Sequence, residues 1–313
     1  MNNLIAIVGP TGSGKSDLAL KLARVFDGEI VNADSRQLLR YLDIGTAKPS
    51  IKEKASIPHH LLDISSPGHD YNLADFQRLA YQTIDEIQSR GKLPFLVGGS
   101  GLYVWTTLEG WQIPQVAPNM GLRQSLEARA KVEGTQTLYD ELVELDPEAA
   151  SQIDLRNTRR VIRALEIRLG TISGNINPRV KQMPPYRMLV IGLTALRDNL
   201  YHRIDARVDK MLEMGLVEEV RSVLDMGFSS DAPGLKSVGY KETINYLKGE
   251  LDCAEMADRI KAETHRLVRH QYNWFRLNDQ RIHWFDVETD YLGGTTQLVT
   301  GFLKEKKSEY GFY

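Results

Sequence analysis

The stretch LIAIVGPTGSGKS at residues 4–16 constrains the fold more than any other part of the chain. Residues 4–8 are an apolar run that predicts a buried parallel strand, and an amphipathic helix is expected over 15–25. The motif between them is G-x-x-x-x-G-K-[ST], in which backbone N–H groups and a helix N-terminus hold phosphate. This order predicts an α/β protein, with a P-loop NTPase-like parallel sheet and helices on both faces.

The predicted phosphate loop leaves several classes of enzyme open, because it recognises phosphate and not adenine. Lys15 supplies a cation, and Ser16 supplies a hydroxyl for Mg²⁺, the one cofactor that we expect. An NTPase usually has an Asp after a second apolar strand. Here the strand LPFLV (93–97) runs into GGS, and Asp63 is a weak substitute. The whole loop is Gly9, Pro10, Thr11, Gly12, Ser13, Gly14, Lys15 and Ser16.

The rest of the chain alternates between strands and helices, with one interruption. Residues 114–185 are rich in Arg, Glu and Leu and contain no convincing strand. We therefore expect a catalytic core of residues 1–113 and 186–313 and a helical insertion domain of residues 114–185. The tail from Phe302 is charged and is expected to fray. Further strands are expected over 29–33, 59–64, 93–97, 187–193 and 282–287, and helices over 73–89, 197–214, 216–226, 239–248 and 253–277.

Composition limits the classes of partner and compartment. The net charge of −2 over 313 residues means that any surface for nucleic acid must be local. Cys253 is the single cysteine, which excludes intrachain disulfides and Cys-rich zinc sites. No apolar run approaches about 20 residues and no signal-peptide pattern is present, so we expect a cytoplasmic protein without a membrane partner.

Asp34 is the first candidate for chemistry outside the phosphate loop. It ends the strand that follows the loop strand in sequence, and carboxyl ends of parallel strands line a ligand crevice. Its carboxylate can hold Mg²⁺ or accept a proton from a nucleophile. The competing interpretation is a turn cap. Ser35 and Ser100 carry the same two interpretations, substrate contact or local structure.

The arginines of the insertion allow two interpretations. On a helix, Arg156, Arg159, Arg160 and Arg163 share one face, which suits a track of RNA phosphates. The same face can equally be a solvated surface paired with Glu166.

Ten segments then resemble one family, bacterial tRNA dimethylallyltransferase, also called tRNA isopentenyltransferase or IPP transferase. The resemblance covers about residues 3–290. DIGTAKP and VGYKE in particular belong to no general phosphate-loop pattern. The segments are GPTGSGKS, NADSRQ, YLDIGTAKP, HHLLDI, YNLADF, GGSGLY, RRVIRALEI, RIDAR, VGYKE and HQYNWFR.

The resemblance implies transfer of a dimethylallyl group from its diphosphate to N6 of adenine 37, in tRNAs that read codons starting with U. It implies that Asp34 is the general base and that Ser100 and Arg207 flank the reacting centre. The implied partners are the tRNA anticodon stem-loop and dimethylallyl diphosphate, and we expect a monomer. The implied tRNA contacts are Asp34, Ser35, Arg36, Gln37, Ser100, Arg123, Arg159, Arg160, Val161, Ile162, Arg163, Lys236, Ser237, Val238, Gly239, Tyr240 and Lys241.

Departures from the family pattern leave alternatives. Ser100 replaces the usual Thr, His265 and His270 stand where Arg is usual, and Asn273 replaces Thr. The alternatives are a small-molecule or nucleotide kinase, in which Asp34 positions a hydroxyl acceptor, and an RNA-binding module with a vestigial loop. Prenylation of free AMP or ADP is a third, and it leaves the Arg-rich insertion without a task. Binding of ATP to the phosphate loop stays open.

Overall fold

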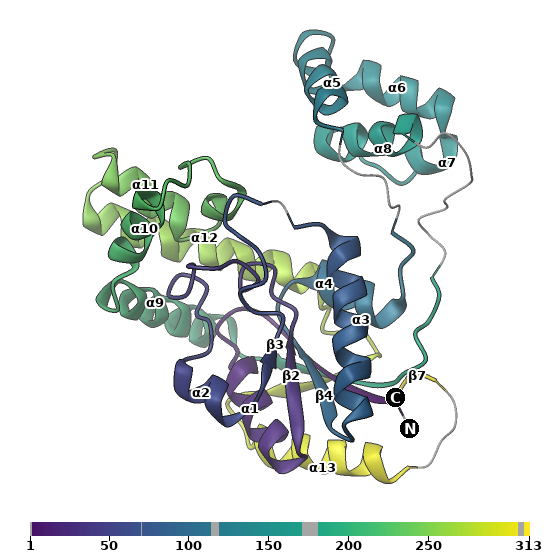
Figure 1. Cartoon of the computed structure of the whole chain (residues 1–313), viewed down its shortest axis with the longest axis vertical. Helices are drawn as coiled ribbons and strands as arrows, with labels where there is room; N and C mark the ends of the chain where they lie inside the picture. The colour runs from purple at the N-terminus through teal and green to yellow at the C-terminus, as the bar shows by residue number, and fades with distance from the viewer. Residues whose placement is uncertain (1, 70, 114–118, 171–180, 306–309) are drawn as a thin grey trace. The chain divides into compact units, whose positions relative to one another are not determined.

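The computed structural model describes residues 2–69, 71–113, 119–170, 181–305 and 310–313 (Figure 1). The chain divides into two compact units. The core unit contains residues 1–111 and 181–313, and the insertion unit contains residues 112–180. The sequence pattern predicts 114–185 for the insertion, so the two divisions differ by a few residues at each end.

A parallel sheet forms the centre of the core unit. Its strand order is β3-β2-β4-β1-β5-β6, with β7 beside β5, and every pairing is parallel. The carboxyl ends of β1, β2, β4 and β5 therefore share one edge, where ligands bind in such sheets. The strands are β1 Asn3–Val8, β2 Gly28–Asn32, β3 His59–His60, β4 Leu93–Val97, β5 Arg187–Thr194, β6 Ile282–Asp286 and β7 Gly311–Phe312.

Helices cover both faces of this sheet, as the sequence predicts. The side chains of β1 alternate, with Leu4, Ala6 and Val8 in one core cluster and Ile5 and Ile7 in the other. The first cluster packs under α3 (Leu73–Ser89) and α4 (Gly101–Glu109), and the second under α1 (Lys15–Val25) and α13 (Tyr291–Lys304). The P-loop-like α/β fold is thus confirmed.

A helical subassembly extends the core unit beyond the sheet (Figure 1). Its apolar cluster also takes in Leu39 and Leu42, so the segment after Asp34 is packed against these helices. The short α2 (Ile51–Ser56) follows that segment. The subassembly contains α9 (Arg197–Glu213), α10 (Leu216–Asp225), the 3₁₀ turn Pro233–Lys236, α11 (Tyr240–Leu247) and α12 (Cys253–Trp274).

The insertion unit is helical in its described part and has a core of its own. Leu126, Leu138, Leu142, Val161 and Leu165 are all buried in that core. Arg156 lies before α8, so the predicted four-arginine helix face is shorter than expected. The helices are α5 (Met120–Val132), α6 (Thr135–Leu145), α7 (Pro147–Ala150) and α8 (Thr158–Gly170).

Two local expectations are wrong. The strand predicted over 59–64 ends at His60, because Leu61 and Asp63 have φ of 59° and 57°, outside the extended region. The tail does not fray throughout: Phe302 is buried in α13, and Gly311–Phe312 pairs with β5. Residues 306–309 of this tail lie outside the described residues. None of the described helices is long and apolar enough to cross a membrane.

Candidate active site

The phosphate loop joins β1 to α1 at the carboxyl edge of the sheet. Gly9 has φ of 140°, and a Cβ there would lie 2.4 Å from the Leu193 carbonyl oxygen, so only glycine fits. Gly14, with φ of 83°, immediately precedes the first residue of α1, Lys15. The positive end of the α1 dipole therefore faces the loop, which favours an anion there.

Lys15, Asp34 and Arg207 influence one another electrostatically. Lys15 Nζ donates a hydrogen bond to the Pro10 carbonyl at 2.7 Å. Burial lowers the pKa of Lys15 to about 8, with Asp34 acting to raise it and Arg207 to lower it. Burial also lowers the pKa of Arg207, again opposed by Asp34. Asp34 is thus the counter-charge of two partly desolvated cations, which an added anion would stabilise.

Two cavities meet at these residues. The small cavity, about 160 Å³, is lined by Lys15 and Ser16 of the phosphate loop. The large cavity, about 440 Å³, is lined by Ser35 and Ser100 and has an apolar wall that includes Trp274. Both belong to the core unit. The residues that line both cavities are Thr11, Asp34, Thr46, Gly99 and Arg207.

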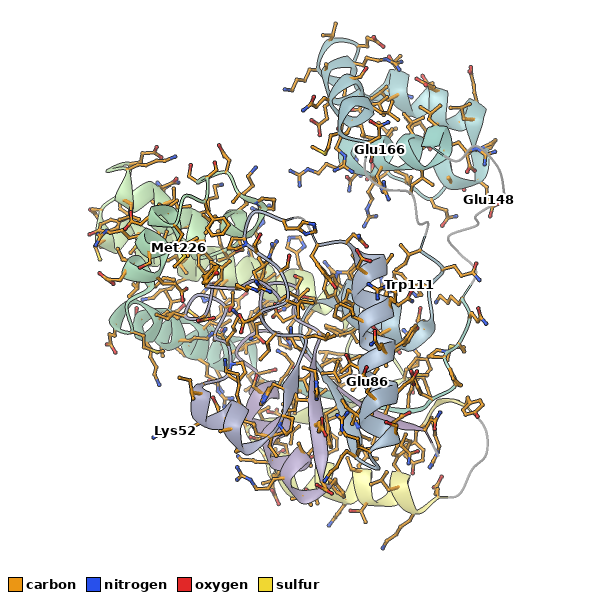
Figure 2. The ribbon with its side chains drawn as sticks, viewed as in Figure 1. Lys52, Glu86, Trp111, Glu148, Glu166 and Met226 are labelled. Atoms are coloured by element: carbon orange, nitrogen blue, oxygen red, sulfur yellow. The ribbon has the colours of Figure 1, made fainter. Side chains whose placement is uncertain are left out.

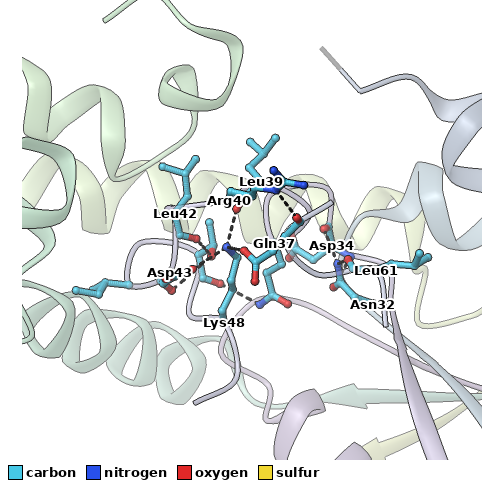
Figure 3. A network of polar contacts seen from close by, with 12 residues as sticks. Asn32, Asp34, Gln37, Leu39, Arg40, Leu42, Asp43, Lys48 and Leu61 are labelled. Atoms are coloured by element: carbon cyan, nitrogen blue, oxygen red, sulfur yellow. Dashed lines mark hydrogen bonds and ion pairs between the residues drawn. The ribbon is translucent and has the colours of Figure 1, made fainter. Parts of the chain in front are cut away.

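Asp34 combines the two roles that the sequence leaves open. Its Oδ1 accepts a hydrogen bond from the Arg36 backbone N–H at 2.9 Å, which is the turn cap. The Asn32 side chain holds the Asp34 backbone through its N–H at 3.0 Å and its carbonyl at 3.1 Å (Figure 3). No hydrogen bond to Asp34 Oδ2 occurs within the described residues. One oxygen therefore fixes the carboxylate while the other is available to a ligand.

Ser100 is tied to the neighbouring loop. Its Oγ accepts a hydrogen bond from the Ser35 backbone N–H at 3.0 Å and lies 3.3 Å from Ser35 Oγ. The hydroxyl thus joins the turn after β4 to the turn after β2, in addition to lining the large cavity.

Gln271 is a site residue that sequence reasoning missed. Its Oε1 accepts a hydrogen bond from the Thr11 backbone N–H at 2.8 Å, and its Nε2 donates to the Gly99 carbonyl at 3.1 Å. The side chain is buried and lines the large cavity. It therefore links the phosphate loop to the turn that carries Ser100. The motif HQYNWFR contains this residue but does not reveal its partners.

The segment around Lys48 is held by buried charge (Figure 3). Lys48 Nζ, whose side chain is 2% exposed, contacts the Leu39 carbonyl at 2.6 Å and the carboxylates of Asp43 at 2.7 Å and Asp63 at 2.5 Å. Asp63 is thus engaged by Lys48. The position after β4 cannot supply a carboxylate either, because a Cβ on Gly98 would lie 2.2 Å from the Ala33 carbonyl oxygen.

Glu219 of α10 holds the adjoining backbone. Its Oε2 accepts from the Asp43 and Ile44 N–H groups at 2.8 and 2.7 Å, and its Oε1 accepts from Tyr240 Oη at 2.6 Å. Burial raises the pKa of Tyr240, so this phenol remains a donor. The segment DIGTAKP, whose Thr46 lines both cavities, is therefore preorganised.

Most residues predicted to contact tRNA in the core unit do gather at the large cavity. Two of them do not. Lys241 is exposed and lines neither cavity. Gln37 lines the small cavity, and its Nε2 donates to the Thr46 and Ala47 carbonyls at 3.1 Å. Those at the large cavity are Asp34, Ser35, Arg36, Ser100, Lys236, Ser237, Val238, Gly239 and Tyr240.

The arginines predicted in the insertion unit differ in their surroundings. Arg159 and Arg160 are exposed, and neither makes an ion pair with another described residue. Arg123 and Arg163 lie 2.8 and 3.4 Å from the buried carboxylate of Glu166, which is labelled in Figure 2. The paired-face interpretation thus holds for Arg163 and not for Arg159 or Arg160.

Val161 and Ile162 require a correction. Both side chains are buried in the core of the insertion unit, at 0% and 4% exposure. They hold α8 in place and do not present a surface to RNA.

The departures from the family pattern in α12 also have distinct surroundings. His265 Nε2 lies 2.8 Å from Asp205 Oδ1, and the ring stacks on Tyr201 with centroids 3.9 Å apart. His265 is therefore engaged within the core unit. His270 is exposed and lines the large cavity, and Asn273 is exposed.

Comparison with known proteins places this geometry in a family. The family model described as IPP transferase matches residues 37–278. A tRNA dimethylallyltransferase of Thermomicrobium roseum is 49% identical, covering 98% of this chain and 93% of that protein. One from Dehalococcoides mccartyi is 45% identical, covering 98% and 94%.

Solved structures give the same result. The tRNA isopentenylpyrophosphate transferase of Bacillus halodurans is 41% identical, with a TM-score of 0.73 and coverage of 98% of both chains. A structure of eukaryotic dimethylallyltransferase acting on tRNA is 26% identical, with a TM-score of 0.81 and coverage of 97% of this chain and 81% of that one. The chain therefore belongs to the IPP transferase family.

Proposed function

We propose that this enzyme transfers a dimethylallyl group from dimethylallyl diphosphate to N6 of adenine 37, in tRNAs that read codons starting with U. The observation that carries the proposal is the pair of cavities that share Asp34 and Arg207. A diphosphate in the small cavity and a base in the large one would meet at these two side chains. Family membership supports the choice of a prenyl diphosphate over a nucleoside triphosphate as the donor.

The small cavity suits the leaving group. Lys15, Ser16 and Arg207 line this cavity, and their side chains would meet the negative charge that grows as the allylic C–O bond breaks. Donors placed in advance stabilise such charge by roughly 2.7–4 kcal/mol each, by analogy with oxyanion holes. The five-carbon group then passes to the amine as the electron pair of the C–O bond leaves with diphosphate.

Asp34 suits the acceptor. The exocyclic amine of adenine is a weak nucleophile, because its lone pair is delocalised into the ring. As the N–C bond forms, the amine must lose a proton, and we assign its acceptance to Asp34 Oδ2. The capped Oδ1 keeps the carboxylate oriented during this step. The large cavity leaves room for an adenine swung out of the anticodon loop.

The small cavity suits Mg²⁺ when phosphate oxygens of the substrate complete its set of ligands. Among the described residues, no group of three or more His, Cys, Asp or Glu side chains is arranged to hold a metal unaided. Ser16 lines the small cavity, and a hydroxyl plus substrate phosphate oxygens suits a hard cation that keeps several waters. We propose Ser16 as the protein ligand, with the ion neutralising diphosphate charge when bound.

Binding of tRNA is assigned to the large-cavity residues and the exposed arginines of α8. Arg159 and Arg160 are suited to phosphate contacts, because they are exposed and unpaired within the described residues.

A direct assay tests the proposal. Purified protein is incubated with unmodified tRNA and dimethylallyl diphosphate, and the nucleosides are analysed by mass spectrometry. We expect N6-(dimethylallyl)adenosine at position 37, and none when ATP replaces the prenyl donor. Absence of the modified nucleoside, or ATP hydrolysis that depends on a small-molecule acceptor, contradicts the proposal and favours a kinase.

A further inference from the structure

The two ends of the insertion unit meet on the core unit. The insertion begins after Trp111 and ends before Lys181, and these two residues are antiparallel bridge partners. The Gln182 backbone N–H donates to the Gly110 carbonyl at 2.9 Å. A Cβ on Gly110 would lie 1.8 Å from the Gln182 carbonyl oxygen, so the two backbones are in contact. The chain thus leaves and re-enters the core unit at one point.

Glu109, the last residue of α4, is the carboxylate at that point. Its side chain is 7% exposed, and its Oε2 accepts from Trp111 Nε1 at 2.5 Å and pairs with Lys181 Nζ. Its Oε1 accepts from Arg281, which lies just before β6. Burial alone would raise the pKa of Glu109, but hydrogen bonds from Lys181, Trp111 and Arg281 hold that pKa below the ordinary value. One charged carboxylate therefore joins the outgoing chain, the incoming chain and the sheet.

The same cluster is connected to the large cavity. The Arg281 guanidinium lies 4.0 Å from the ring centre of Trp105, and Trp105 Nε1 donates to the Trp274 carbonyl at 2.9 Å. Trp274 lines the large cavity, and its ring centre is 6.5 Å from that of Trp111 (Figure 2 labels Trp111). The root of the insertion unit and the wall of the large cavity thus share one network of charged and aromatic contacts, in which Glu109 and Trp105 are buried.

We propose that Glu109 is a positioning residue for tRNA: it clamps together the two core-unit segments at which the chain leaves for the insertion unit and returns from it. This inference rests on the proposed function. Association orders side chains and chain segments at a cost, and a root ordered before binding reduces that cost. Glu109 lines neither cavity, so we expect the chemical step and donor binding to be independent of it.

Three variants test the clamp. Glu109→Gln removes the charge, and Lys181→Met releases one chain end through a side chain that is 53% exposed, which spares the core. The matched control is Glu29→Gln. Glu29 is a buried carboxylate at the amino end of β2, paired with Arg90 at 2.7 Å and His60 at 2.6 Å, and it lines neither cavity.

The expected result separates positioning from stability. Glu109→Gln and Lys181→Met raise KM for tRNA about three- to tenfold, the size expected from ordering one or two more side chains on binding. The kcat at saturating tRNA and the Kd for dimethylallyl diphosphate stay unchanged, and hydrogen exchange at the Gln182 amide accelerates. Glu29→Gln changes none of these.

Other outcomes overturn the inference. If hydrogen exchange at the Gln182 amide accelerates but the KM for tRNA is unchanged, Glu109 clamps the chain ends but has no role in tRNA binding. An equal rise in KM for Glu29→Gln shows general destabilisation instead. An unchanged exchange rate at Gln182 refutes the clamp itself, and this readout is independent of activity. A wild-type enzyme that never modifies tRNA refutes the proposed function and with it the role in positioning.

Discussion

Donor binding should weaken as pH rises through the pKa of Lys15. Burial lowers that pKa to about 8 in the ligand-free protein, and a bound diphosphate requires the charged ammonium. Below pH 8 the group is already protonated, so Kd should be nearly flat. Above it the charged fraction falls about tenfold per pH unit, equivalent to about 1.4 kcal/mol of binding free energy per unit. At about pH 9 the Kd for dimethylallyl diphosphate should therefore be about tenfold weaker than at neutral pH.

Isothermal titration of dimethylallyl diphosphate across this pH range measures the effect, and two variants locate it. Lys15→Arg keeps a guanidinium that stays charged, so its Kd should show no bend near pH 8. Asp34→Asn removes the charge that raises the pKa of Lys15, so its bend should move to lower pH. A wild-type Kd that stays flat through about pH 9.5, or the same bend in Lys15→Arg, refutes the assignment to Lys15.

Three further predictions concern other parts of the site. Asp34→Asn keeps the Oδ1 acceptor for Arg36 and should fold and bind tRNA normally, yet single-turnover rates should fall about 10²–10⁴-fold; an unchanged rate removes Asp34 as the base. Arg160→Ala should weaken tRNA binding and reduce the slope of log K against log salt by about 1, without changing donor affinity; equal loss for both substrates contradicts this division. Gln271→Leu leaves the Thr11 N–H and the Gly99 carbonyl without their hydrogen-bond partner. It should lower the free energy of unfolding by about 1–3 kcal/mol, measured by denaturant titration, and weaken donor binding, measured by calorimetry. An effect on stability alone means that Gln271 does not shape the phosphate loop.

Local patterns were sufficient for much of the fold and part of the site. The apolar runs of β1, β2, β4 and β5 are short and bounded by turns, so their burial could be inferred without partners. The phosphate loop is encoded in eight consecutive residues, and the strand before Asp34 places that residue at the sheet edge. In each case the determining interactions lie within a few residues of one another.

What the sequence analysis missed depends on contacts between distant segments. Gln271 meets Thr11 across 260 residues, and nothing near either residue predicts the other. The strand predicted over 59–64 ends at His60, where the backbone changes to positive φ at Leu61 and Asp63, and the Asp63 side chain pairs with Lys48 from an earlier segment. The two-residue β7 is too short to be predicted from its own sequence and depends on pairing with β5.

Burial within the insertion unit was missed for a similar reason. Val161 and Ile162 were grouped with the arginines because they stand beside them in a family motif. The packing of α8 against α5 and α6 turns those two side chains inward. Adjacent residues of a helix point in different directions, so a contiguous motif combines residues of unlike surroundings.

The close approach of β2 and β4 at Gly98 has an evolutionary consequence. A hydrolase that uses a carboxylate after this strand needs a side chain at that place, and here any Cβ would collide with the backbone of Ala33. A single codon change therefore cannot add that carboxylate at position 98, because the two strands must first move apart. Packing at this position therefore excludes one substitution route to a carboxylate-dependent hydrolytic site.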